Sequence, residues 1–170
     1  MTKQWFTLCT RPQHELKVAA ALSKKGLESF CPLTRKMLVN NGFRKRITWS
    51  PVFPSFVFVY ISEAEFSNVL RTNDVVNFMY WMGKPAVVAE SDIKSLEHFT
   101  TRYPNVTLER TAVIKNIMAA SEPGVYQTEV DETDDSIRKV LPSLGFILTA
   151  SREKNYRIIN RNIESGKMMN

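Results

Sequence analysis

The sequence predicts an α+β fold in which helices flank an antiparallel sheet and a small β-rich domain follows. Helical and extended patterns alternate as far as Pro104, giving about three helices and five strands before that point. The dipeptide Asn41-Gly42 stands between two strand-like runs and indicates a hairpin, hence antiparallel pairing. Beyond Pro104 only short strand candidates separated by turn residues remain. We therefore expect a helix-and-sheet sandwich followed by a small β-domain.

The composition is that of a globular chain of one or two domains. Of its 170 residues, 44% are hydrophobic and 24% are charged, which is enough to bury a core. No apolar run reaches the roughly 18 residues of a membrane-spanning helix, and the N-terminus MTKQWFTLCTR lacks a signal-peptide pattern. We expect a cytoplasmic protein without a membrane partner. The expected segments are an N-terminal domain over 1–104, a linker over 105–112, a β-domain over 113–160 and a polar tail over 161–170.

Local signals predict the first strand and helix. Trp5 to Thr10 is an extended run of apolar and small residues. Thr10 and Gln13 have the spacing of a helix capping box, Pro12 suits the first turn, and Gly26 ends the helix. The apolar stripe predicted for this helix consists of Leu16, Ala19, Ala20, Ser23 and Leu27.

Aromatic and β-branched side chains alternate in the stretch WSPVFPSFVFVYI, residues 49–61. A strand here points its aromatic residues to one face and its aliphatic residues to the other, and neither face suits water. Such a strand is buried on both faces or lends one face to a partner. We assign Val57, Val59 and Ile61 to the core, whereas Phe58 and Tyr60 stay open between core and contact.

Three further groups of elements follow from spacing and turn chemistry. Ser62 and Glu65 form a capping box for a short helix, and an extended run covers residues 75–81. Ser91 is predicted to cap a helix that carries Ile93, Leu96, Phe99 and Tyr103 at helical spacing. The strand candidates of the β-domain are 113–118, 125–130, 137–141 and 146–150, with one more at 156–159.

Positive charge is concentrated in the first third of the chain. Residues 1–61 hold ten lysines and arginines against two acids, and the whole chain has a net charge of +6. Cations on a projecting hairpin suit phosphate groups, because binding releases condensed counterions. The alternatives are a solvated basic face and charges that protect an exposed strand edge. The five cations that flank the hairpin turn are Arg35, Lys36, Arg44, Lys45 and Arg46.

The common signatures of enzymes are missing from the sequence. It has no nucleophile elbow, no phosphate-binding glycine array and no HExxH motif. His14 and His98 fall on separate predicted helices, and Cys9 and Cys31 have no partners at metal-ligand spacing, so we expect buried thiols. We predict a binding protein with no catalytic residues, no metal site and no cofactor.

The order of these motifs resembles the N-terminal domain of the NusG family of transcription elongation factors. The resemblance rests on WFTLCTRPQHELKVAAALSKKGLESFCPL, then WSPVFPSFVFVYI, then VVNFMYWMGKPAVVAESDI, within residues 4–103. Its details are similar to the specialised RfaH-like and UpxY-like regulators, and DSIRKVLPSLGFILTA resembles the ends of UpxY-type proteins. The second domain resembles a degenerate KOW barrel. Residues 121–126 occupy the place of the family's glycine-containing motif, but the glycine pair of that motif is missing.

The resemblance implies a regulator of transcription elongation and antitermination for operons such as surface polysaccharide loci. Its implied partners are the clamp helices of the RNA polymerase largest subunit, the non-template DNA strand and, through the C-terminal domain, a ribosomal protein or another factor. The alternative function is an RNA- or ribosome-associated nucleic-acid-binding module. The implied polymerase-binding residues are Cys9, Phe53, Pro54, Phe56, Ile93 and Leu96, with Cys9 in the place of a frequent aromatic. The implied nucleic-acid-binding residues are Arg11, Arg44, Lys45, Arg46 and Arg71.

Overall fold

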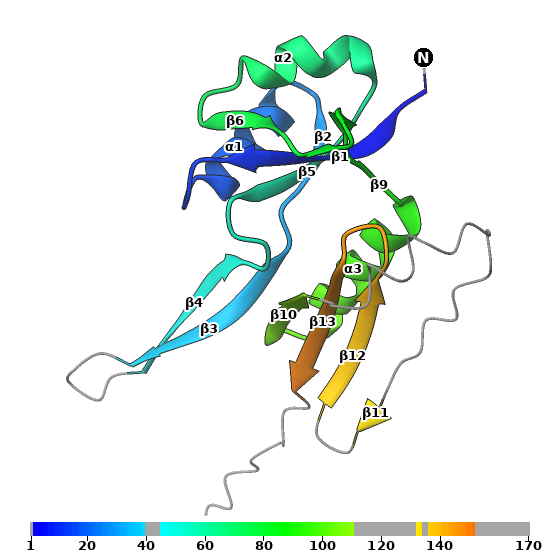
Figure 1. Cartoon of the computed structure of the whole chain (residues 1–170). Helices are drawn as coiled ribbons and strands as arrows, with labels where there is room; N and C mark the ends of the chain where they lie inside the picture. Colours follow the sequence, from blue (N-terminus) through cyan, green and yellow to red (C-terminus); the bar gives the residue numbers. More distant parts are fainter. Residues whose placement is uncertain (1, 40–44, 111–131, 134–135, 152–170) are drawn as a thin grey trace, which may run out of the picture.

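The computed structural model describes residues 2–39, 45–110, 132–133 and 136–151 (Figure 1). Within these ranges the chain forms an α+β fold with two larger antiparallel sheets, one from the N-terminal half and one from residues after 105. None of the helices in the described ranges has the length and hydropathy needed to cross a membrane.

The N-terminal sheet is antiparallel throughout. Its strands are β1 (Gln4–Thr10), β2 (Glu28–Phe30), β5 (Phe56–Ile61), β6 (Val75–Phe78) and β9 (Val87–Val88). Their order is β2-β5-β1-β6, and β9 pairs with the other end of β1. The register places Trp5 opposite Tyr60 and Cys9 opposite Phe56. Because opposite residues share a face, this register defines one aromatic and one aliphatic face for β5.

The two faces of β5 belong to two hydrophobic cores. Val57, Val59 and Ile61 are fully buried against α1 (Glu15–Lys24) and α2 (Phe66–Leu70), as predicted. On the opposite face Phe58 is also fully buried, and Tyr60 is half-buried beside Trp5. Phe58 is therefore a core residue rather than an exposed contact.

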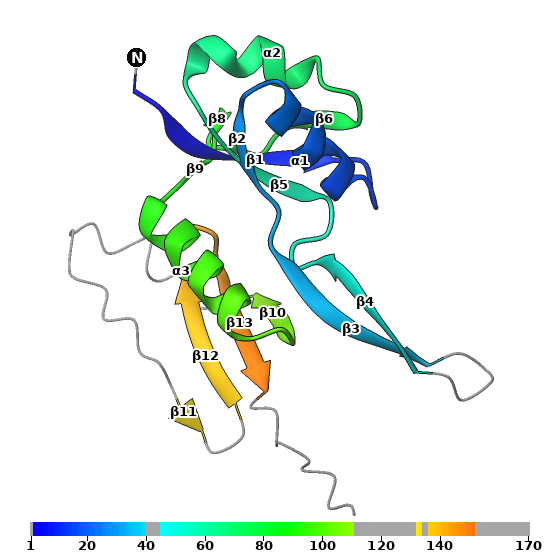
Figure 2. The same ribbon diagram turned by 180° about the vertical axis from the view of Figure 1, so that it is seen from behind.

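The β3–β4 ribbon, made of β3 (Leu33–Val39) and β4 (Lys45–Pro51), projects from the body of the molecule (Figures 1 and 2). Its two arms confirm the predicted hairpin, whereas the turn at Asn41-Gly42 lies outside the described residues. The base of the ribbon is anchored by Thr34, whose hydroxyl accepts from the Val106 N–H at 2.8 Å and lies 2.9 Å from the Val106 carbonyl. Among the described residues, these bonds hold the base of the ribbon against β10.

The C-terminal sheet packs with α3 (Glu90–Arg102) on the aromatic side of the N-terminal sheet (Figure 2). Its strands are β10 (Val106–Arg110), β11 (Glu132–Thr133), β12 (Ser136–Leu141) and β13 (Phe146–Ser151), in the order β10-β13-β12-β11. Strands β12 and β13 confirm the candidates at 137–141 and 146–150. The candidates at 113–118, 125–130 and 156–159 lie outside the described residues. This β-rich region is consistent with a KOW-like domain.

Residues 106–110 were expected in a linker but form β10, which pairs along its length with β13. The alternation of Val106 and Leu108 with polar neighbours allows this pairing, because one side of β10 can join the core. The extended run over 75–81 is interrupted at Met79. The residues beyond this break form β7 (Tyr80–Trp81), which pairs with β8 (Lys84–Pro85).

Two helix starts differ from the prediction. Helix α1 begins at Glu15, because Thr10 ends β1 and Gln13 has a left-handed φ of 66°. Its buried residues are Glu15, Val18 and Leu22. The predicted stripe is wrong for Leu16, Ala20 and Ser23, which are exposed, and Leu16 is 48% exposed. The other two members agree with the prediction, since Ala19 packs on the core and Leu27 is buried. Helix α3 begins at Glu90 after Ala89, so Ser91 lies inside the helix rather than capping it. The capping box of Ser62 and Glu65 is confirmed: it opens a short 3-10 turn, η1 (Glu63–Glu65), that leads into α2.

The carboxylate of Glu15 connects two turns of the N-terminal domain. One of its oxygens, Oε1, accepts from the backbone N–H of Gln13 at 3.3 Å and of Ser55 at 2.6 Å. Ser55, like Gln13, has a φ of 66°. The turn before α1 and the turn before β5 therefore share one acceptor, and Glu15 is itself buried.

Replacing Phe58 by alanine is expected to reduce the free energy of unfolding by about 3–5 kcal/mol, because it removes a fully buried ring at the junction of both sheets. Urea denaturation followed by circular dichroism measures the change. Tyr80→Ala is the matched control, since Tyr80 is 50% exposed and should cost no more than about 0.5 kcal/mol. Equal losses in both variants would contradict the assignment of Phe58 to the core.

Candidate functional site

The predicted polymerase-binding residues meet on the aromatic side of the N-terminal sheet. Phe53 and Pro54 lie in the turn before β5, Phe56 begins that strand, and Cys9 stands opposite Phe56 on β1. Ile93 and Leu96 come from α3 and join Phe53 in one hydrophobic core. Their accessibility differs, because Phe53, Ile93 and Leu96 are buried, Cys9 and Phe56 are half-buried, and Pro54 is exposed.

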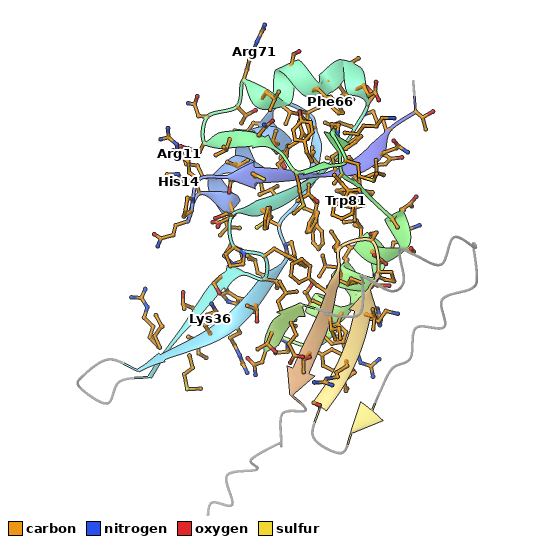
Figure 3. All side chains as sticks on the ribbon, in the orientation of Figure 1. Arg11, His14, Lys36, Phe66, Arg71 and Trp81 are labelled. Carbon is orange, nitrogen blue, oxygen red and sulfur yellow. The ribbon has the colours of Figure 1, made fainter. Side chains whose placement is uncertain are left out.

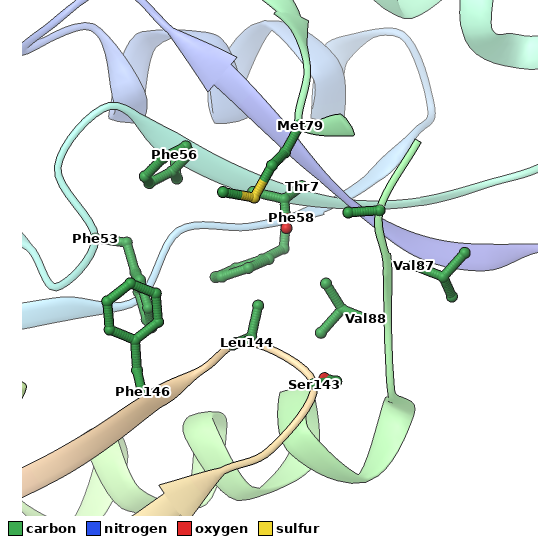
Figure 4. A pocket seen from close by; sticks show the side chains of 11 residues that line it. Thr7, Phe53, Phe56, Phe58, Met79, Val87, Val88, Ser143, Leu144 and Phe146 are labelled. Atoms are coloured by element: carbon green, nitrogen blue, oxygen red, sulfur yellow. The ribbon is translucent and has the colours of Figure 1, made fainter. Parts of the chain in front are cut away.

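The hairpin of β12 and β13 covers Phe53. The ring centroids of Phe53 and Phe146 are 5.4 Å apart at an interplanar angle of 82°, an edge-to-face contact. Leu144, in the turn of this hairpin, packs against the same core. Figure 4 shows Leu144 and Phe146 facing Phe53, Phe56 and Phe58 across a small cavity of about 40 Å³. In this arrangement a partner can reach Phe53 only if the hairpin moves.

Asp92 holds the turn of this hairpin against the first turn of α3. Its Oδ2 accepts from the backbone N–H of Ser143 at 2.8 Å and from the Ser143 hydroxyl at 2.7 Å. The same hydroxyl accepts from the N–H of Ala89 at 3.1 Å. Asp92 is buried, and hydrogen bonds to a charged acceptor are the stronger kind. These contacts hold the β12–β13 hairpin over Phe53. No local sequence pattern predicted them.

Both cysteines are free thiols and half-buried. Burial raises the pKa of the Cys9 thiol above its ordinary value. For Cys31, burial and then the negative charge of Glu15 raise the pKa to about 12. Both side chains are therefore protonated near neutral pH and contribute apolar surface rather than charge.

The predicted nucleic-acid-binding residues fall into two separate groups. Arg11 and Arg71 are exposed on the N-terminal body, and Figure 3 shows both far from Lys36 on the β3–β4 ribbon. Arg46 is exposed on β4, and Lys45 begins that strand. Arg44 lies outside the described residues. The structure thus separates a body group from a ribbon group.

Around Arg11 the cations gather on one carboxylate, that of Asp74. Lys17 Nζ lies 2.7 Å from Oδ2, while His14 Nδ1 and Arg11 Nη1 lie 3.4 Å and 4.0 Å from Oδ1. The hydrogen bond from Lys17 is the main cause that lowers the pKa of Asp74, and the charges of His14, Lys17 and Arg11 add to it. The sequence patterns did not predict this cluster, because Asp74 is 57 residues from Lys17 in the chain. Asp74 orients the cations while cancelling part of their charge.

Residues 3–97 match the family described as "Transcription termination factor nusG". The chain belongs to the NusG family. Proteins of this family are transcription factors that bind RNA polymerase. The matched region of this NusG-family protein contains the β3–β4 ribbon, the Asp74 cluster and the aromatic turn, which consists of Phe53, Pro54 and Phe56. The C-terminal sheet follows the matched region.

Among solved structures, one described as "Domain interaction in Thermotoga maritima NusG" is similar over 89% of this chain and 94% of that chain. The sequence identity is 15% and the TM-score is 0.47, so this similarity adds nothing to the family assignment. No curated protein matches the chain.

Asp92→Ala is expected to loosen the β12–β13 hairpin, because Ser143 loses the acceptor for both of its donors. Hydrogen bonds to charged groups contribute about 1.5–3 kcal/mol, so amide exchange in β13 should accelerate about tenfold or more. Hydrogen–deuterium exchange with mass spectrometry measures it. Glu90→Ala is the control, since Glu90 lies in the same helical turn and its ion pair with Lys94 is exposed. Unchanged exchange in Asp92→Ala would show that other contacts hold the hairpin.

Asp74→Asn is expected to flatten the acid limb of the stability curve. A lowered carboxyl pKa in the folded state stabilises the fold at pH values above about 4, the ordinary value for aspartate. That stabilisation is lost as the pH falls through the lowered folded-state pKa. Urea midpoints between about pH 2 and 6 should therefore change less in Asp74→Asn than in the wild type. Glu97→Gln, on an exposed carboxylate of α3, is the control and should follow the wild-type curve.

Proposed function

We propose that this protein is a transcription elongation and antitermination regulator of the specialised, RfaH-like or UpxY-like kind. It binds the clamp helices of the RNA polymerase largest subunit through the aromatic turn and holds exposed DNA of the elongation complex through its basic side chains. Its targets are specific operons such as surface polysaccharide loci. Family membership supports the polymerase as partner, since NusG-family proteins bind it.

One observation carries the choice of the aromatic turn. Exposed Pro54 and half-buried Phe56 lie at the rim of an aromatic core whose cover is a separate segment of the chain. Aromatic side chains at the centre of a protein interface contribute disproportionately to affinity. A clamp helix that displaces Phe146 and Leu144 would take over their apolar contacts with Phe53. Binding of the clamp helix and release of the β12–β13 hairpin would then be coupled, because both use the same apolar surface of Phe53.

The proposed roles of Ile93 and Leu96 depend on the same exchange. Both are buried where α3 packs on the C-terminal sheet, so they reach a partner only after that sheet has moved. Cys9 needs no such movement, because it is half-buried beside Phe56 at the rim. We therefore place Pro54, Phe56 and Cys9 in the initial contact, with Phe53, Ile93 and Leu96 following.

The basic groups support a contact with nucleic acid. The side chain of Arg11 is 71% exposed although its guanidinium faces Asp74, and Arg46 and Arg71 are exposed as well. Exposed cations neutralise phosphates at little desolvation cost. With one group on the body and one on the ribbon, two separated stretches of a nucleic acid can be held at once.

Phe56→Ala is expected to weaken binding to a reconstituted RNA polymerase elongation complex by about 30-fold or more, as for an aromatic anchor worth about 2–4 kcal/mol. Biolayer interferometry measures it. Tyr60→Ala is the matched control, since Tyr60 is half-buried on the same face of β5, at the opposite end of that strand. Asp92→Ala, which frees the hairpin, should bind more tightly than the wild type.

Two results would refute this function. One is an equal loss in Phe56→Ala and Tyr60→Ala, which would remove the aromatic turn as the contact. The other is wild-type protein that binds free RNA tightly, with a steep salt dependence, and the elongation complex no better. That outcome belongs to an RNA- or ribosome-associated module.

A further inference from the structure

The β3–β4 ribbon carries a face whose apolar side chains are largely exposed. Its register pairs Met37 with Ile47 and Arg35 with Trp49, so these four side chains share one face. Met37, Ile47 and Trp49 are 60%, 56% and 55% exposed. Apolar side chains gathered on a projecting ribbon, rather than scattered singly, indicate a binding surface.

A hollow adjoins Trp49 at the base of the ribbon. It has a volume of about 410 Å³ and opens widely to solvent. Its wall includes Phe30 and Pro32 on one side and the helix residues Thr100 and Thr101 on the other. The exposed Thr101 hydroxyl offers hydrogen bonding at the edge of an otherwise apolar concavity. A flat ring can thus lie against the Trp49 indole with a polar group within reach of its edge.

The charge of the ribbon identifies the kind of partner. Residues 29–62 contain five cations and no acid. Lys36 and Arg46 project from the opposite face to Trp49, where Lys36 pairs with Thr48 and Arg46 with Leu38. A purely apolar protein partner would not need this uniform positive charge. A partner that carries both negative charge and accessible flat rings matches the cations and the exposed indole of the ribbon. Single-stranded nucleic acid has this chemistry.

We propose that Trp49 is a base-stacking residue and that the β3–β4 ribbon binds unpaired nucleotides. The bases lie on the face of Trp49, Met37 and Ile47. The phosphates run along the ribbon edges, where the long side chains of Lys36 on β3 and Arg46 on β4 reach them from the opposite face. A duplex is excluded from this mode, because its base faces are already stacked. The proposal rests on the nucleic-acid contact of the proposed function and deepens it by naming an unpaired strand, DNA or RNA, as the ligand of the ribbon.

The test is fluorescence anisotropy of the full chain with labelled oligothymidylate and oligouridylate of about 12 nucleotides, and with a DNA duplex of equal length. Trp49→Ala should weaken single-strand binding about 5- to 100-fold, and Trp49→Phe, which keeps a stacking ring, should restore most of it. Trp81→Ala is the matched control, since Trp81 is 60% exposed on a different strand pair. Comparing the two single strands shows whether DNA or RNA is preferred.

Salt dependence separates stacking from phosphate binding. The double variant Lys36→Gln, Arg46→Gln should reduce the slope of log affinity against log salt by about 1.4, at about 0.7 per phosphate contact with a single strand. Trp49→Ala should leave that slope unchanged while lowering the affinity at every salt concentration. A variant that had merely lost the fold would change both quantities together.

Three results would overturn the proposal: single-strand affinity unchanged in Trp49→Ala, an equal loss in Trp81→Ala, or a duplex bound as tightly as the single strands. If Trp49→Ala lowered only the affinity for the polymerase complex, the ribbon face would be a protein contact instead. The oligonucleotide assay contains no polymerase, and Phe56→Ala should leave it unchanged. Failure of base stacking and failure of the polymerase contact are therefore distinguishable.

Discussion

Phe58 and Val59 are neighbours in the chain, yet their side chains are fully buried in different hydrophobic cores. Alternation along an extended strand makes this unavoidable, so β5 needs a cover on each face. Helices α1 and α2 supply one cover, and α3 with the C-terminal sheet supplies the other. The second cover overlies Phe53, which is also a proposed binding residue. Internal packing and the proposed partner binding would therefore compete for one aromatic surface.

Much of the N-terminal fold was readable from the sequence, because its signals are local. The alternation of residues 56–61 and the box of Ser62 and Glu65 depend on near neighbours only, and both are confirmed. The similar spacing of Thr10 and Gln13 failed because tertiary contacts override it. Thr10 stays in β1, and the Gln13 N–H turns to the Glu15 carboxylate.

The sequence predicted the candidate site only where its residues are neighbours in the chain. Phe53, Pro54 and Phe56 come from one motif and lie together, whereas Asp92 and Ser143 are 51 residues apart and Lys17 and Asp74 are 57 apart. No periodicity connects such pairs, because the packing of separate elements creates them. The solvent exposure of individual side chains was equally unpredictable from the sequence. Trp49 and Phe53 lie in one apolar stretch, yet one side chain faces solvent and the other is buried.

The carboxylate of Glu15 also limits how this domain can be altered. Since one oxygen serves the N–H groups of Gln13 and Ser55, the loop bearing Arg11 and the loop bearing Phe53 are held at a fixed spacing. A loop of different length on either side would leave one of these partly buried N–H groups without its acceptor. Exchanging either loop between related proteins therefore requires transferring both loops together with residue 15. A graft of either loop alone would disturb the other surface.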